Sequence, residues 1–176
     1  NVLPVVWNVR TQVSINDDGS LTSESFEALK REAIDYYSRL ASVYGDYFTY
    51  YELYNEWNNG SPENAVSAEE YAEIVVEVSK AIKEIDSDAK IVALASGDDI
   101  WCSSNYCSYY SPTEAGHQEF TEDSWVARVL KTKWEDKTGD MKPFLNFIDV
   151  VSIHLYPYNF KKSLEENYYV ERMKEV

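Results

Sequence analysis

The chain reads S-A-E-E-Y-A-E-I-V-V-E-V-S-K-A-I-K-E-I-D-S-D-A-K-I-V-A-L-A-S from Ser67 to Ser96, and this stretch decides the fold. Ser67 and Glu70 have the spacing of a capping box, which opens a helix. The apolar residues that follow recur at helical spacing, and we expect one buried face made of Tyr71, Ile74, Val75, Val78, Ile82 and Ile85. The continuous apolar run from Ile91 to Ala95 is typical of a buried strand, which we predict from Lys90 to Ser96. The stretch therefore predicts a helix followed directly by a strand.

The same pattern extends toward the N-terminus. A helix is predicted from Glu24 to Tyr44, with Gly45 as its C-cap, and a strand from Phe48 to Asn55. The turn residues Asn16-Asp17-Asp18-Gly19 precede the helix, and Val2–Trp7 is an apolar run suited to a buried strand. The apolar face expected for this helix consists of Phe26, Leu29, Ala33, Tyr37, Leu40 and Tyr44.

Toward the C-terminus, a long loop reaches to about Phe120 and a third helix starts at Thr121. A fourth strand is predicted from Phe147 to Leu155, and a polar helix from about Lys162. The long loop contains Cys102 and Cys107, whose short spacing permits a disulfide in an oxidising, extracellular compartment but does not require one.

Four strands that alternate with helices predict an α/β protein with a parallel sheet. A doubly wound sheet and a (β/α) TIM barrel both fit, but no strand is followed by a Gly-rich phosphate loop. A full barrel needs about 250 residues. We therefore interpret residues 1–176 as one partial barrel domain, about half of a barrel with four βα units. The remainder of the barrel, or a second copy of the chain, is expected to cover its open edges.

The composition narrows the classes of partner. Sixteen basic residues against 31 acidic ones give a formal charge of −15, which repels nucleic acids and anionic membrane surfaces. No stretch has the roughly 20 continuous apolar residues of a membrane helix. The 15 Tyr and five Trp residues suit both a packed core and the binding of sugars, whose apolar faces stack on aromatic rings.

Polar residues follow the predicted strands directly, at the ends where barrel enzymes carry their active groups. The strand ends supply Trp7 and Asn8, Asn55 and Glu56, Ser96 to Asp98, and His154 and Tyr156, and all but the third set are polar groups that directly follow an apolar run. Alternation along a strand is expected to place Tyr50, Glu52, Tyr54 and Glu56 on one face of the second strand. A carboxylate on a buried face is costly unless it is paired or functional.

The stretch Y-E-L-Y-N-E-W from Tyr51 to Trp57 resembles the fourth-strand motif of the clan of retaining glycoside hydrolases with (β/α) barrels. This clan includes cellulases, β-xylosidases, α-L-iduronidases and β-galactosidases. The resemblance implies that Glu56 is the general acid/base and that Asn55 binds the sugar 2-hydroxyl. Glu52 also matches a residue often seen in the xylosidase-like branch, whereas Trp57 stands where the family usually has proline.

A second stretch, S-I-H-L-Y-P-Y from Ser152 to Tyr158, resembles the sixth strand of the same family. The resemblance implies that His154 and Tyr156 line the substrate site and that the chain spans the third strand to the sixth helix. Ser152 is expected on their face of the strand, with Val151 and Ile153 toward the helices. Among the tryptophans, Trp7, Trp57 and Trp101 are candidate sugar platforms, and Trp125 and Trp134 are expected in the core.

Retaining hydrolysis needs two carboxyl groups about 5 Å apart. The family's nucleophile is a Glu at the end of the seventh strand, so the resemblance places it outside this chain. We therefore expect a secreted glycosidase that cleaves O-glycosidic bonds in a plant-type oligo- or polysaccharide, with no cofactor and no metal. The alternatives are a catalytically inactive carbohydrate-binding remnant of a barrel and a doubly wound domain of another function.

Overall fold

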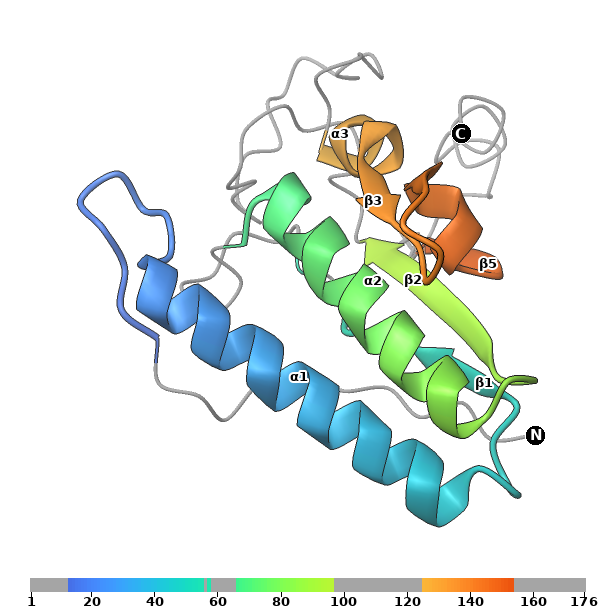
Figure 1. Ribbon diagram of the computed structural model, residues 1–176. Coiled ribbons are helices and arrows are strands. Elements are labelled where there is room, and N and C mark those ends of the chain that lie inside the picture. Colours follow the sequence, from blue (N-terminus) through green and yellow to red (C-terminus); the bar gives the residue numbers. More distant parts are fainter. Residues whose placement is uncertain (1–12, 56, 58–65, 97–124, 154–176) are drawn as a thin grey trace, which may run out of the picture.

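The computed structural model describes residues 13–55, 57, 66–96 and 125–153 (Figure 1). The helices are α1 (Ser23–Tyr44), α2 (Ala68–Ile85), α3 (Trp125–Lys131) and the short 3-10 helix η3 (Phe144–Phe147). The strands are β1 (Tyr50–Glu52), β2 (Lys90–Ser96), β3 (Lys133–Glu135), β4 (Met141–Pro143) and β5 (Val150–Ile153). The predicted strand at Val2–Trp7 and the predicted helix near Lys162 lie outside the described residues.

Local signals in the sequence set the ends of the two long helices. The predicted capping box is present: Ser67 Oγ accepts from the Glu70 N–H, and the Glu70 carboxylate accepts from the Ser67 N–H. Gly45 is the C-cap of α1, as predicted, but with an ordinary right-handed φ of −53°. Glycine is needed here because a Cβ would lie 2.7 Å from the Ala41 carbonyl oxygen.

The predicted apolar faces of these helices are largely confirmed. Both faces are buried along most of their length, including Leu29, Ala33 and Tyr37 on α1. The prediction was wrong for Tyr44 and Ile85, which are 47% and 45% exposed. Each is the last residue of its helix, where the chain already turns toward the next strand.

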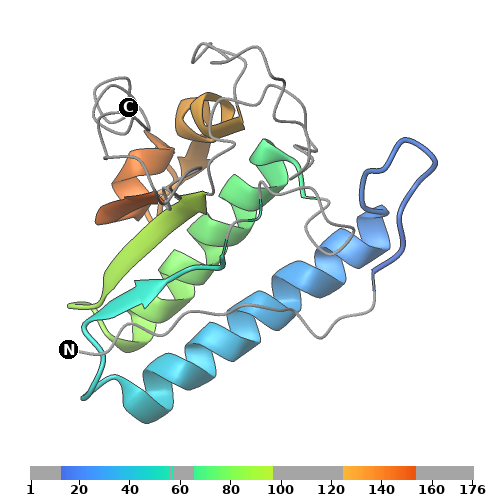
Figure 2. The same ribbon diagram turned by 180° about the vertical axis from the view of Figure 1, so that it is seen from behind.

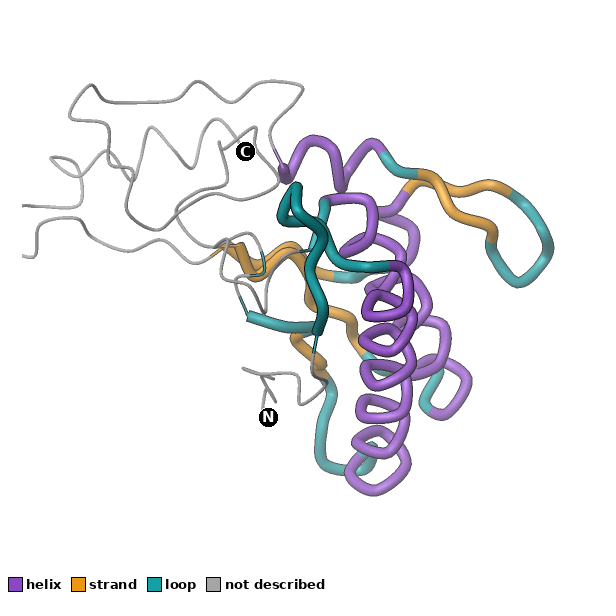
Figure 3. The backbone as a smooth tube through the Cα atoms, turned by 90° about the vertical axis from the view of Figure 1, so that its left-hand side faces the viewer, coloured by secondary structure: helices purple, strands orange, loops and turns teal. Residues whose placement is uncertain are grey.

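The main sheet contains β1, β2 and β5, all parallel and in chain order. Helices α1 and α2 run side by side along one face of this sheet, as the two opposite views show (Figures 1 and 2). A side view shows the strands as a layer next to the helices (Figure 3). The parallel α/β class predicted from the sequence is therefore confirmed.

Two strands are shorter than predicted. β1 ends at Glu52 instead of Asn55, because Tyr54 adopts a left-handed φ of 64° that extended backbone excludes. β5 begins at Val150 instead of Phe147, which belongs to η3. The Phe147 carbonyl accepts a hydrogen bond from the buried Ser79 hydroxyl of α2, which fixes η3 against the helix layer.

The sequence interpretation missed the β3–β4 hairpin, which projects beyond the helices (Figure 3). Its turn is stabilised by the Asp136 carboxylate, which accepts from the Thr138 N–H and hydroxyl and from the Asp140 N–H. Trp134, which was expected in the core, lies in β3 and packs partly buried against the core. Trp125, also expected in the core, is fully buried on α3.

No helix within the described ranges is long and apolar enough to cross a lipid bilayer.

Asp149 joins three elements at the start of β5. Its carboxylate accepts from Lys83 of α2 at 2.8 Å and from the Ile91 N–H of β2 at 3.0 Å, and Lys90 lies 3.4 Å away. Partial burial alone would raise the pKa of Asp149, but the hydrogen bonds from Lys83 and Ile91 outweigh it and hold that pKa below its ordinary value of 3.8. The ionised form of Asp149 therefore stabilises the fold.

We expect Asp149→Asn to lower the free energy of unfolding at pH 7 by roughly 1 kcal/mol, allowing for solvent screening of this partly exposed group. Because the pKa is lowered by folding, this contribution is complete above pH 3.8 and disappears as the pH falls through the folded-state pKa. Urea unfolding at several pH values measures it. The control Asp35→Asn, from the exposed pair with Arg39, should change little; an equal, pH-independent effect of both variants would contradict the assignment.

Candidate functional site

The structure describes two of the eight predicted site residues, Asn55 and Trp57. Asn55 is partly buried and follows β1 after two residues of irregular backbone. The predictions for the other six stay predictions, because these residues lie outside the described ranges: Trp7, Asn8, Glu56, Trp101, His154 and Tyr156.

A buried phenol from α1 holds the end of β1. The Tyr37 hydroxyl donates to the Glu52 carbonyl oxygen at 2.9 Å and accepts from the Tyr54 N–H at 3.0 Å. Burial raises the pKa of Tyr37 well above its ordinary value, so the phenol stays neutral and can both donate and accept. The backbone just before Asn55 is thereby tied to the helix layer.

Tyr54 departs from the predicted alternation of the strand. Alternation was expected to place its ring on the same face as Glu52, but its φ of 64° ends the extended conformation. The ring instead contacts Tyr37 of α1 at a centroid distance of 5.7 Å and Trp57 at 3.8 Å. A left-handed backbone at a bulky residue is strained, and such strain persists only where the surrounding structure enforces it. Tyr37 supplies that restraint.

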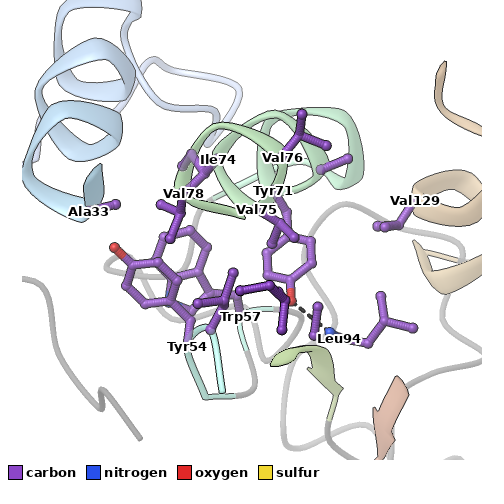
Figure 4. Packing of buried hydrophobic residues seen from close by; sticks show 14 of the residues in the cluster. Ala33, Tyr54, Trp57, Tyr71, Ile74, Val75, Val76, Val78, Leu94 and Val129 are labelled. Atoms are coloured by element: carbon purple, nitrogen blue, oxygen red, sulfur yellow. Dashed lines mark hydrogen bonds between the residues drawn. The ribbon is translucent and has the colours of Figure 1, made fainter. Parts of the chain in front are cut away.

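Trp57 is 2% exposed and belongs to the core. Its indole lies against the Tyr54 ring and at 6.0 Å from the ring of Tyr71, between the end of β1 and α2 (Figure 4). A sugar platform must present one ring face to the ligand, and this indole has almost no exposed surface. The burial favours a packing role beneath the strand end over the expected sugar platform.

Near the end of β2, as near the end of β1, a buried phenol from a helix holds backbone with positive φ values. Leu94 and Ala95 have positive φ values of 80° and 35°, and the pairing with β5 shifts register between Ala93 and Ser96. The Leu94 N–H donates to the hydroxyl of Tyr71 on α2 at 2.8 Å (Figure 4). A bulge or similar irregularity therefore interrupts the regular pairing of β2 with β5 at this point. Each long helix therefore inserts one phenol at the end of the strand that follows it.

The face of the sheet opposite the helices carries a buried carboxylate. Strand register aligns Glu52, Val92 and Val150, and Ser152 lies two residues further along β5 on the same face. We call this set the carboxylate face. Glu52 is 4% exposed, and its Oε1 accepts from the Ser152 hydroxyl at 2.7 Å. This contact shows that the two side chains lie on the same face of the sheet.

The charge of Glu52 also acts on the helix layer. Burial, together with that nearby negative charge, raises the pKa of Tyr71 well above its ordinary value. Like Tyr37, Tyr71 therefore remains a neutral hydrogen-bonding group. The sequence interpretation counted both tyrosines as apolar face residues and missed the role of their hydroxyls. A buried Tyr hydroxyl usually needs a hydrogen-bond partner. The presence of a tyrosine on the apolar face of each long helix was therefore the signal in the sequence for these hydrogen bonds.

Among the described residues, no group of three His, Cys, Asp or Glu side chains is arranged to hold a metal ion. Comparisons with protein-family models, with curated proteins and with solved structures gave no match.

We expect Tyr37→Phe to lower the free energy of unfolding by about 2 kcal/mol or more, because it leaves the Glu52 carbonyl and the Tyr54 N–H without their partner. Tyr51→Phe is the matched control: this phenol is equally buried, but its oxygen has no hydrogen-bond partner in the described part of the structure. Chemical denaturation should show a change within about 0.5 kcal/mol for Tyr51→Phe. Equal losses for the two variants would refute the role given to the Tyr37 hydroxyl.

Proposed function

We propose that the chain is about half of the (β/α) barrel of a retaining glycoside hydrolase, with Glu56 as general acid/base. The observation that carries this proposal is the construction of the end of β1. A buried phenol and a left-handed residue hold the backbone immediately before the Asn55-Glu56 pair. Catalytic groups need such restraint, because small errors in their position cost large factors in rate.

Three features support a barrel. The strands β1, β2 and β5 are parallel and in chain order, and the long helices cover one face of the sheet. A doubly wound sheet carries helices on both faces. The contact from Glu52 to Ser152 joins two strands that are separated by β2. Side chains from alternate strands form the interior layers of a barrel.

The chemistry follows the two-step scheme for retention. Glu56 donates a proton to the leaving glycosidic oxygen while a second carboxylate attacks the anomeric carbon, and Glu56 then deprotonates the water that releases the sugar. The second carboxylate is a Glu outside this chain. Asn55 holds the sugar 2-hydroxyl, where hydrogen bonds strengthen in the transition state.

The remaining predicted residues complete the proposed substrate site. Asn8 and Trp7 belong to the strand predicted before α1, whereas His154 and Tyr156 follow β5 in the sequence and Trp101 follows β2. The substrate is a plant-type oligo- or polysaccharide, and the protein acts outside the cell. The rest of the barrel, or a second copy of the chain, closes the open edges of the sheet.

The test uses a polypeptide that contains these 176 residues together with the nucleophile. Glu56→Ala should lower the hydrolysis of an aryl glycoside by about 100-fold or more. Added azide should restore turnover, because azide attacks the glycosyl-enzyme without help from a base. The glycosyl azide product should keep the anomeric configuration of the substrate. Steady-state kinetics and product NMR measure both.

Glu135→Gln, a change at an exposed carboxylate of the β3–β4 hairpin, is the control and should hydrolyse at the original rate. Unchanged hydrolysis in Glu56→Ala would refute the assignment. Saccharide binding without hydrolysis in the unmodified protein would instead favour the inactive carbohydrate-binding remnant.

A further inference from the structure

One hydrogen bond spans the sheet between residues that lie 100 positions apart in the chain. Ser152 of β5 donates to the Glu52 carboxylate of β1, and β2 lies between these two strands. Neighbouring strands lie about 4.8 Å apart, so the two backbones joined by this bond are separated by roughly twice that spacing. The bond therefore limits how far the two outer strands can move apart on the carboxylate face.

The bond lies next to the two segments that carry the proposed site. Asn55 follows Glu52 by three residues, and His154 follows Ser152 by two. A chain spans at most about 3.6 Å per residue, so both intervals are short. A change in the separation of Glu52 and Ser152 is therefore expected to move the segments that follow these two residues in the chain.

Glu52 is also held by its main chain. Its carbonyl oxygen accepts from Tyr37, so the residue is tied both to β5 and to α1. The charge of Glu52 also contributes to the raised pKa of Tyr71, whose hydroxyl accepts from the N–H of Leu94 near the end of β2. Glu52 of β1 is thus connected directly to α1 and to β5.

We propose that Glu52 and Ser152 are positioning residues that fix the spacing between the end of β1 and the end of β5, and thereby the geometry of the sugar site. The proposal rests on the proposed function and adds two residues to it. Glu52 acts through Asn55 and Glu56 and does not touch the substrate, because its carboxylate is almost fully buried. A buried carboxylate is costly to retain, and a positioning role accounts for its presence.

The experiment compares three serine variants in the polypeptide that also contains the nucleophile. Ser152→Ala removes the donor, and Ser152→Thr keeps a hydroxyl on a residue that suits a strand. Ser79→Ala is the matched control, since it removes another hydroxyl that is hydrogen-bonded between distant elements, the one that donates to the Phe147 carbonyl.

Two experiments are made on each variant: steady-state kinetics, which gives kcat and KM for an aryl glycoside, and NMR, which gives the backbone amide shift of Asn55. Ser152→Ala should lower kcat by about 10- to 100-fold with little change in KM, and should move the Asn55 amide signal. Ser152→Thr should restore both, and Ser79→Ala should leave both unchanged. Combining Ser152→Ala with Glu52→Ala should lower kcat no further than Glu52→Ala alone, because the two act through one bond.

The outcomes separate this inference from the proposed function. If Glu56→Ala abolishes hydrolysis but Ser152→Ala behaves like Ser79→Ala, the positioning role is overturned and the catalytic assignment stands. If Glu56→Ala leaves hydrolysis intact, the proposed function fails, and the Asn55 amide alone decides the role of Ser152. A shift in Ser152→Ala that is absent in Ser79→Ala then supports positioning of the strand end, and no shift overturns it.

Discussion

The described structure depends on two buried phenols that hold strained backbone at the ends of neighbouring strands. The Tyr37 hydroxyl accepts a hydrogen bond from the N–H of Tyr54, and the Tyr71 hydroxyl accepts one from the N–H of Leu94. Tyr54 and Leu94 both have left-handed backbone. Without these partners, each strand would lose a hydrogen bond at the point where its backbone conformation is least favourable. The helices therefore do more than cover the sheet: they hold the backbone near the C-terminal ends of β1 and β2.

This dependence explains which parts of the fold could be predicted from the sequence. The extent of α1 and α2, the capping box at Ser67, the strand Lys90–Ser96 and the parallel order follow from periodicity and local caps. These are local signals. The early end of β1 could not be predicted from local sequence, because it depends on Tyr37. That residue lies 17 positions before Tyr54 and belongs to α1.

The site was predictable to a smaller extent. Alternation correctly put Glu52 and Ser152 on one face, since both lie where the strands are regular. It failed for Tyr54, where a left-handed residue breaks the period, and Trp57 accordingly lies in the core where a sugar platform was expected. The β3–β4 hairpin was missed because its three-residue strands are too short to give a period, although its Asp- and Gly-containing turn was visible.

The packing of Trp57 also gives the molecule a built-in optical reporter. Its indole lies against Tyr54 and near Tyr71, and is sealed from water at the end of β1. Excitation absorbed by those tyrosines passes to the indole at such short range, and the emission of an indole shifts to longer wavelength when water reaches it. In a variant that keeps Trp57 as its single tryptophan, the emission wavelength therefore records whether the backbone immediately before Asn55 is still packed against the helices.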